Sequence, residues 1–146
     1  MILDAITRGT RIARRLSADQ PNRYAAVTHH VHDGDTVMAL VWTPPVQQYV
    51  LTGCRVLGVQ APEMDEPGGP DVAAAVAELV QPGRLLLIGD VHSYPRPAHI
   101  TCSVALVDGP DLATWLLERG YAVPWDGRGK RPTVPWPPVP PAQPTP

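Results

Sequence analysis

Two acidic residues flank a glycine early in the chain, in the sequence DGDTV at residues 33–37. Arg55 and then Glu63 follow, and further along a second arginine, Arg96, lies close to Tyr94. Carboxylate oxygens bind hard cations such as Ca²⁺ or Mg²⁺, a further carboxylate can take a proton from water, and guanidinium groups bind phosphate oxygens bidentately. Together these residue types are the ones that phosphodiester cleavage needs.

Each of the later residues has a candidate role in that chemistry. Glu63 is the candidate general base, which would deprotonate the attacking water, and Pro62 restricts the backbone before it. Arg55 and Arg96 would bind the scissile phosphate and stabilise the negative charge of the transition state. Tyr94 would pack on the nucleotide or form a hydrogen bond to it. The alternatives are structural ion pairs for the arginines and an ordinary exposed loop position for Glu63.

Five segments, taken in order, resemble the staphylococcal nuclease-like (thermonuclease) family. They are DGDTV at 33–37, RVLGVQAPE at 55–63, a helix led by Gly-Pro from residue 69, YPR at 94–96 and LLERGYA at 116–122. No segment is specific alone, but their order and approximate spacing match the family. The resemblance implies a cation-dependent nuclease, with an endonuclease as the expected type. It would cleave single-stranded or frayed DNA or RNA with little sequence preference.

The resemblance also implies roles for the residues around the first turn. It makes Asp35 the direct metal ligand and Asp33 an outer acid, with the Thr36 hydroxyl beside them. Asp33, Thr36 and Tyr94 then lie on the substrate-binding side of the site. Ala61 would contribute its backbone carbonyl oxygen to the metal, which is a suitable ligand for Ca²⁺.

Gln60 departs from the family, which usually has a metal-binding aspartate at this place. An amide oxygen still coordinates hard cations, but it contributes no charge. A carboxylate–cation pair is worth roughly 4 kcal/mol at an effective dielectric constant of ~20, so we expect metal affinity lower by one to a few decades. The expected cofactor is therefore weakly bound Ca²⁺, with Mg²⁺ or Mn²⁺ as alternatives. The alternative function is a catalytically impaired module that binds nucleic acid or a protein partner.

Hydrophobic patterns predict the elements that must position these residues. Strands are predicted at 24–32, 36–43, 49–57, 84–91 and 98–107, and helices from residue 70 to the stop signal at 82–83 and from 112 to 120. The predicted fold class is α+β, mainly β: a five-stranded OB-type Greek-key barrel with two helices, plus an N-terminal helix. The order of elements leaves other α+β folds open, and the resemblance selects the OB-type barrel.

The chain divides into three regions. Residues 1–22 are predicted to form an amphipathic helical extension, whose basic face carries Arg8, Arg11, Arg14 and Arg15. Residues 23–127 form the nuclease-like domain, and residues 128–146 form a basic and then Pro-rich tail. Half of the residues from 131 onward are proline, which favours an extended, disordered spacer. A docking peptide for a partner protein is the alternative interpretation of this tail.

Length and composition limit the number of domains, the partners and the cellular location that we expect. A chain of 146 residues fits one domain, and the formal net charge of −2 does not by itself indicate a nucleic-acid partner. There is no apolar run of ~18 residues and no signal-peptide pattern, so we expect no membrane partner and a place in the cytoplasm of a bacterial or phage-infected cell. We also expect a monomer. Cys54 and Cys102 lie in strand-like runs and are expected to be buried free thiols.

Several histidines could suggest a metal site. Strand alternation would put His30 and His32 on one face and His29 on the other, and no cysteine pair accompanies them at zinc-ligand spacing. We therefore expect these three to be exposed strand histidines. His92 and His99 flank the loop that carries the second arginine and could line the same cleft, where a histidine could act as general acid.

Overall fold

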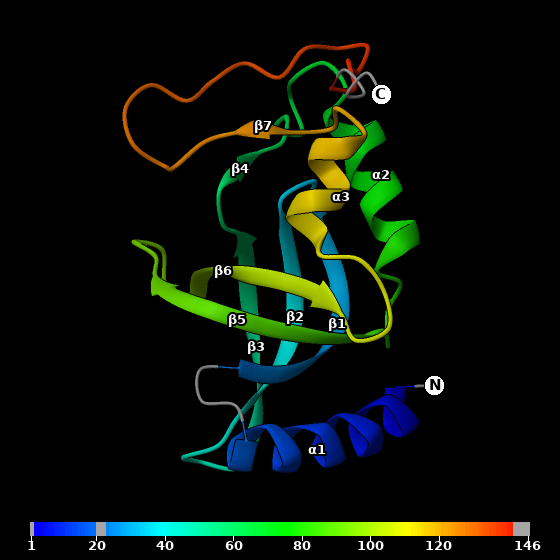
Figure 1. Ribbon diagram of the computed structural model, residues 1–146, viewed down its shortest axis with the longest axis vertical. Helices are drawn as coiled ribbons and strands as arrows, with labels where there is room; N and C mark the ends of the chain where they lie inside the picture. Colours follow the sequence, from blue (N-terminus) through cyan, green and yellow to red (C-terminus); the bar gives the residue numbers. More distant parts are fainter. Residues whose placement is uncertain (1, 20–22, 142–146) are drawn as a thin grey trace, which may run out of the picture.

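The computed structural model describes residues 2–19 and 23–141, and a closed five-stranded barrel lies at its centre (Figure 1). The spatial order of the strands is β1-β2-β3-β6-β5, and β5 pairs back onto β1. The strands are β1 (Arg23–Asp33), β2 (Thr36–Thr43), β3 (Gln48–Val56), β5 (Leu85–Ser93) and β6 (His99–Leu106). Alternating apolar side chains fill the interior, with Leu86, Ile88 and Val27 among the largest that are fully buried.

Three helices and a short ribbon complete the fold. The helices are α1 (Ile2–Asp19), α2 (Gly69–Leu79) and α3 (Leu112–Glu118), and the ribbon pairs β4 (Val59–Gln60) with β7 (Val123–Pro124). Figure 1 shows α1 at one end of the barrel, and α2, α3 and the ribbon at the other. The prediction of a mainly β, OB-type barrel with two helices and an N-terminal helix is confirmed.

The turn between β1 and β2 is held tightly under α2. Asp33 pairs with Thr36 across this turn, and the backbone N–H of Asp35 donates to Asp33 Oδ1 at 3.2 Å. A side chain at Gly34 would place its Cβ 2.6 Å from Val72 Cγ1 on α2. Only glycine therefore lets the turn approach the helix this closely, and the approach directs Asp35 into the protein.

Strand β6 pairs with β3 in parallel, and this pairing brings distant parts of the chain together. Arg55 on β3 lies in register with Thr101, and Gly53 with His99. A Cβ atom at Gly53 would collide with the His99 ring, so glycine is needed for the ring to lie there. The loop between β5 and β6 brings Tyr94 and Arg96 to the same pocket as Arg55.

Helix α1 packs on the barrel through small residues and one tyrosine. Ala5 is buried, and the Tyr49 hydroxyl donates to the Ile6 carbonyl oxygen at 3.0 Å. Arg8 and Arg11 are exposed, as the amphipathic pattern predicts, whereas the side chains of Arg14 and Arg15 lie outside the described part of the structure. No helix among the described residues is long and apolar enough to cross a membrane.

The prediction that His29 faces away from His30 is wrong. The register of β1 against β2 shifts between Thr28 and His30, and such a bulge breaks the alternation of a regular strand. The two adjacent rings meet as a result, with 2.7 Å between His29 Nδ1 and His30 Nδ1. Both residues are exposed, as is His32, in agreement with the prediction of exposed histidines. Cys54 and Cys102 are buried free thiols, as predicted.

The Pro-rich region also differs from expectation as far as it is described. Residues 131–141 contain no helix or strand, yet Val134 is buried and the Trp136 ring lies against Gly68. This stretch therefore packs on the domain and does not extend away from it. The large apolar side chains that stand between its prolines, Val134 and Trp136, contact the domain surface. Residues 142–146 of the predicted tail lie outside the described residues.

The contact between the turn and α2 can be tested by mutation. Gly34→Ala should lower the free energy of unfolding by about 1–3 kcal/mol, because the added methyl group overpacks a filled site. Urea denaturation of Gly34→Ala, Val72→Ala and the double variant measures the coupling between the two positions. The penalty of Gly34→Ala should shrink when Val72 is already alanine, and an equal penalty in both backgrounds would contradict the contact.

Candidate functional site

Asp35 is the most deeply buried acidic group of the site, with an exposed fraction of 3%. Its Oδ2 atom accepts a hydrogen bond from the backbone N–H of Ala61 at 2.9 Å, and its Oδ1 atom accepts one from the Thr36 hydroxyl at 3.2 Å. Asp33, on the other side of the turn, is also buried. The turn thus holds two carboxyl groups inside the protein.

Arg55 lies directly beside this carboxyl pair. Its Nη2 atom is 3.5 Å from Asp35 Oδ2 and donates to Gln60 Oε1 at 2.9 Å. Its Nη1 atom donates to the backbone carbonyl oxygens of Val56 at 3.0 Å and Val59 at 3.1 Å. Both terminal nitrogens therefore already have protein acceptors, which fixes the guanidinium plane at the end of β3.

The Gln60 side chain bridges the groups around it. Its Oε1 atom faces Arg55, while its Nε2 atom donates to the Ala61 carbonyl oxygen at 2.6 Å and to Glu63 Oε1 at 3.4 Å. The opposite amide orientation would set N–H against N–H and oxygen against oxygen, so the partners determine the orientation. Gln60 thus directs a hydrogen-bond donor, and not an oxygen, toward the Ala61 carbonyl.

This arrangement does not fit a hard divalent cation at the predicted ligands. Ca²⁺ takes several oxygen ligands, but the Gln60 oxygen is engaged by Arg55, and the Ala61 carbonyl oxygen and Asp35 Oδ2 already accept short hydrogen bonds. Within residues 2–19 and 23–141, no group of three or more His, Cys, Asp or Glu side chains is placed to hold a metal ion. The metal roles of Asp35, Gln60 and Ala61, and the Ca²⁺ cofactor, stay predictions.

Burial changes the titration of Asp35. Desolvation and, to a smaller extent, the nearby Asp33 carboxyl group together raise the pKa of this carboxyl group to about 7, although Arg55 acts in the opposite direction. Arg55 does not reverse the rise in this pKa, because burial and Asp33 outweigh its effect. Near neutral pH, Asp35 is therefore close to the midpoint of its titration.

Glu63 begins a tight loop that leads into α2. Its backbone N–H donates to Glu66 Oε1 at 2.8 Å, and the Glu66 N–H donates back to the Glu63 carbonyl oxygen at 2.9 Å. A Cβ atom at Gly69 would collide with the same carbonyl oxygen. The loop is consequently folded against itself, and the Glu63 carboxylate stands half-exposed at its start.

Seven of the predicted residues come together around one pocket of about 130 Å³. Its lining consists of His32, Asp33, Asp35, Thr36, Arg55, Glu63, Tyr94, Arg96 and His99. Gln60 and Ala61 are buried behind this lining. The sequence suggests His99 for this cleft but gives no signal for His32.

The two arginines of the small pocket differ in how they are held. Among the hydrogen bonds and ion pairs of the described residues, none involves the Arg96 side chain, which is exposed on the loop between β5 and β6. Arg55, in contrast, is engaged by several oxygens. Arg96 is thus the more available donor for an incoming anion.

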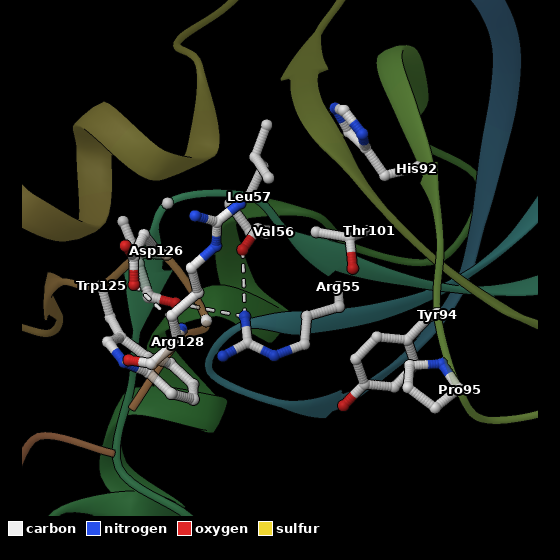
Figure 2. A pocket seen from close by; sticks show the side chains of 13 residues that line it. Arg55, Val56, Leu57, His92, Tyr94, Pro95, Thr101, Trp125, Asp126 and Arg128 are labelled. Carbon is white, nitrogen blue, oxygen red and sulfur yellow. Dashed lines mark hydrogen bonds between the residues drawn. The ribbon is translucent and has the colours of Figure 1, made fainter. Parts of the chain in front are cut away.

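A larger pocket of about 520 Å³ adjoins the first, since Arg55 and Tyr94 line both. Figure 2 shows the rings of Trp125 and Tyr94 on either side of Arg55, and the Arg55 Cζ atom is 5.9 Å from the centre of the Trp125 ring. Arg128 also lines this pocket. Sequence reasoning treated Arg128 as part of a basic linker and assigned no role to Trp125, because only the β4–β7 ribbon brings them here.

No family model matches the chain, and no curated protein matches it. The membership of the staphylococcal nuclease-like family therefore stays a prediction that rests on the five segments and on the positions of their residues.

The raised pKa of Asp35 predicts how stability changes with pH. The folded state keeps the proton to about pH 7, whereas the unfolded chain releases it near 3.8. The stabilising contribution of this proton is fully present below about pH 4 and is lost as the pH rises to 7, with a slope of up to about 1.4 kcal/mol per pH unit. Urea denaturation in EDTA at pH 5, 6, 7 and 8 (roughly the window concerned) should reveal this fall.

Asp35→Asn should flatten that dependence, since an amide does not titrate. Asp65→Asn makes the same change at an exposed position and controls for net charge. Identical pH profiles for the wild-type protein and Asp35→Asn would show that Asp35 does not titrate in this range.

Proposed function

We propose that this protein is a staphylococcal nuclease-like phosphodiesterase that cleaves single-stranded nucleic acid. The supporting observation is that Arg55, Arg96 and Glu63, which come from three separate segments, line one pocket. With about 30 Å³ for a water molecule in the liquid, a volume of about 130 Å³ has room for a phosphate group and a water. These three side chains supply two cations and one carboxylate to that space.

The proposed chemistry follows from how each side chain is held. Arg96, whose donors are available, binds the non-bridging phosphate oxygens, and Arg55 contributes its charge from a fixed position. The Glu63 carboxylate accepts a proton from the water that attacks phosphorus. A metal ion would supply further charge stabilisation if one were bound, but the arrangement of Gln60 does not fit it, and no step depends on it here.

The adjoining pocket suggests the substrate class. Trp125 and Tyr94 present aromatic rings next to the arginines, and bases stack on such rings without strong sequence preference. A base can reach them only when it is free of a duplex, which favours a single strand or a frayed end. Because the net charge of the chain is −2, attraction to the polymer must come from these local arginines.

A second candidate function is nucleic-acid binding without cleavage. The observation that favours it is the network of Gln60, whose hydrogen bonds tie Arg55, the Ala61 carbonyl group and Glu63 together. Because Glu63 Oε1 accepts a hydrogen bond from the Gln60 amide, this oxygen is less available to take a proton from water. Retention of a labelled strand without its degradation would identify this second function.

Variants of the pocket residues test cleavage. With a 5′-labelled single-stranded DNA oligonucleotide as substrate, Glu63→Gln should lower the rate constant by about 10²–10⁴-fold, and Arg96→Met by about 10²–10³-fold. Glu78→Gln and Arg84→Met make the same chemical changes at positions outside both pockets and should cleave like the wild-type protein. Equal cleavage by Glu63→Gln and the wild-type protein would exclude Glu63 as the base.

The position of residue 60 is tested by restoring a carboxylate there. Gln60→Asp should raise the affinity for Ca²⁺ by on the order of tenfold or more, because a negative charge joins the oxygens near Asp35. Calorimetric titration with Ca²⁺ measures this affinity, and the exposed variant Gln81→Asp controls for added charge. If Gln60→Asp binds Ca²⁺ no better than Gln81→Asp, residue 60 does not belong to a cation site.

A further inference from the structure

Residues 131–140, here named the C-terminal strap, contact the loop of the candidate base directly. The Nη1 atom of Arg131 donates to Glu66 Oε1 at 2.8 Å and lies 3.3 Å from Glu63 Oε1. Glu66 Oε1 also accepts the backbone N–H of Glu63 at 2.8 Å. One glutamate oxygen thus joins the strap to the backbone at the start of the loop.

The strap is held by packing at two places, beside the start of α2 and just after the end of α3. The Trp136 ring lies where a side chain on Gly68 would be, and Gly68, with φ of 82°, ends the same loop. Further on, a Cβ atom at Gly120 would come within 2.6 Å of the Val139 backbone. Val134, between Arg131 and Trp136, is buried.

Because of these contacts, the Arg131 ion pair contributes more to stability than its exposure alone suggests. An exposed ion pair contributes little when two free side chains must be ordered to form it, and the Arg131 side chain is 38% exposed. Here the backbone that follows Arg131 is already fixed by Val134 and Trp136, so less conformational entropy is lost on pairing. The hydrogen bond from Arg131 also lowers the pKa of Glu66, which keeps that carboxylate charged.

The strap supports the site from outside and does not fill it. None of the described residues 131–140 lines the small pocket or the larger one. The strap therefore leaves both pockets open, while Arg131 contacts the carboxylate of Glu63. A plug or an inhibitory segment would instead contribute side chains to the lining.

We propose that Arg131 is a positioning residue that holds the 63–69 loop, and through it the carboxylate of Glu63, in place for proton transfer. This role rests on the proposed function, in which Glu63 is the base. The structural half of the proposal, that Arg131 orders the loop, stands independently of catalysis and can be measured without substrate.

Hydrogen exchange measures the structural half. In Arg131→Met the backbone amides of the 63–69 loop, other than Pro67, which has none, should exchange faster by on the order of fivefold, the change that loss of an ion pair of this kind allows. Lys130→Met removes a neighbouring charge and should leave the exchange unchanged, and Arg131→Lys should restore most of the protection. Exchange in Arg131→Met equal to that in the wild-type protein would overturn the proposal.

Steady-state cleavage of the single-stranded oligonucleotide measures the catalytic half. Arg131→Met should lower kcat by on the order of tenfold with KM unchanged, because the phosphate-binding arginines are not touched, and Arg131→Lys should recover kcat. Faster loop exchange with an unchanged kcat would overturn the positioning role. If the wild-type protein cleaves no substrate, the proposed function fails, and the exchange measurement alone decides whether Arg131 orders the loop.

Discussion

The placement of the Arg55 guanidinium group is the interaction on which the site depends most. A guanidinium group can only donate hydrogen bonds, so taking it partly out of water requires oxygens around it. These oxygens come from the β1–β2 turn through Asp35, from the end of β3 through Val56, and from β4 through Val59 and Gln60. A single guanidinium group therefore connects the β1–β2 turn, the end of β3 and β4.

The same interaction divides the work between the two arginines of the pocket. The Arg55 guanidinium group donates to protein oxygens and provides a fixed charge. Arg96 lies on an exposed loop, and its donors are available to a ligand. Two prolines surround Arg96 in the sequence and limit how far its backbone can move. A fixed cation and an available one in the lining of the same pocket suit an anion that must enter and leave.

Much of the fold could be predicted from the sequence, because alternation and turn residues act locally. The apolar alternation of β2 and β6, the Asp-Gly turn and the stop signals of α2 all lie where the pattern places them. The bulge at His29 could not be predicted, since it depends on how β1 pairs with β2. The strands β4 and β7 are each two residues long and carry no periodicity.

Most residues that line the small pocket could be predicted from the sequence, but His32 and the contacts within the site could not. The residues of the pocket follow from the types and order of the motifs, and the β3–β6 pairing brings them together. The orientation of the Gln60 amide depends on its three partners Arg55, Ala61 and Glu63, so it cannot be predicted from a local sequence pattern. The strap was missed for a different reason: its composition indicates disorder, and only the surface beside Gly68 and Gly120 gives Trp136 and Val139 a place.

The parallel pairing of β3 with β6 has a consequence for how the protein folds. Every other pair of barrel strands is antiparallel, and the hairpins β1–β2, β2–β3 and β5–β6 join neighbours along the chain. Contacts between segments distant in sequence form slowly, because the intervening chain must first lose its freedom. The pair that brings Arg55 beside Thr101 spans β4, α2 and β5, so a nascent chain can complete the small pocket, which includes His99, only when synthesis has passed β6.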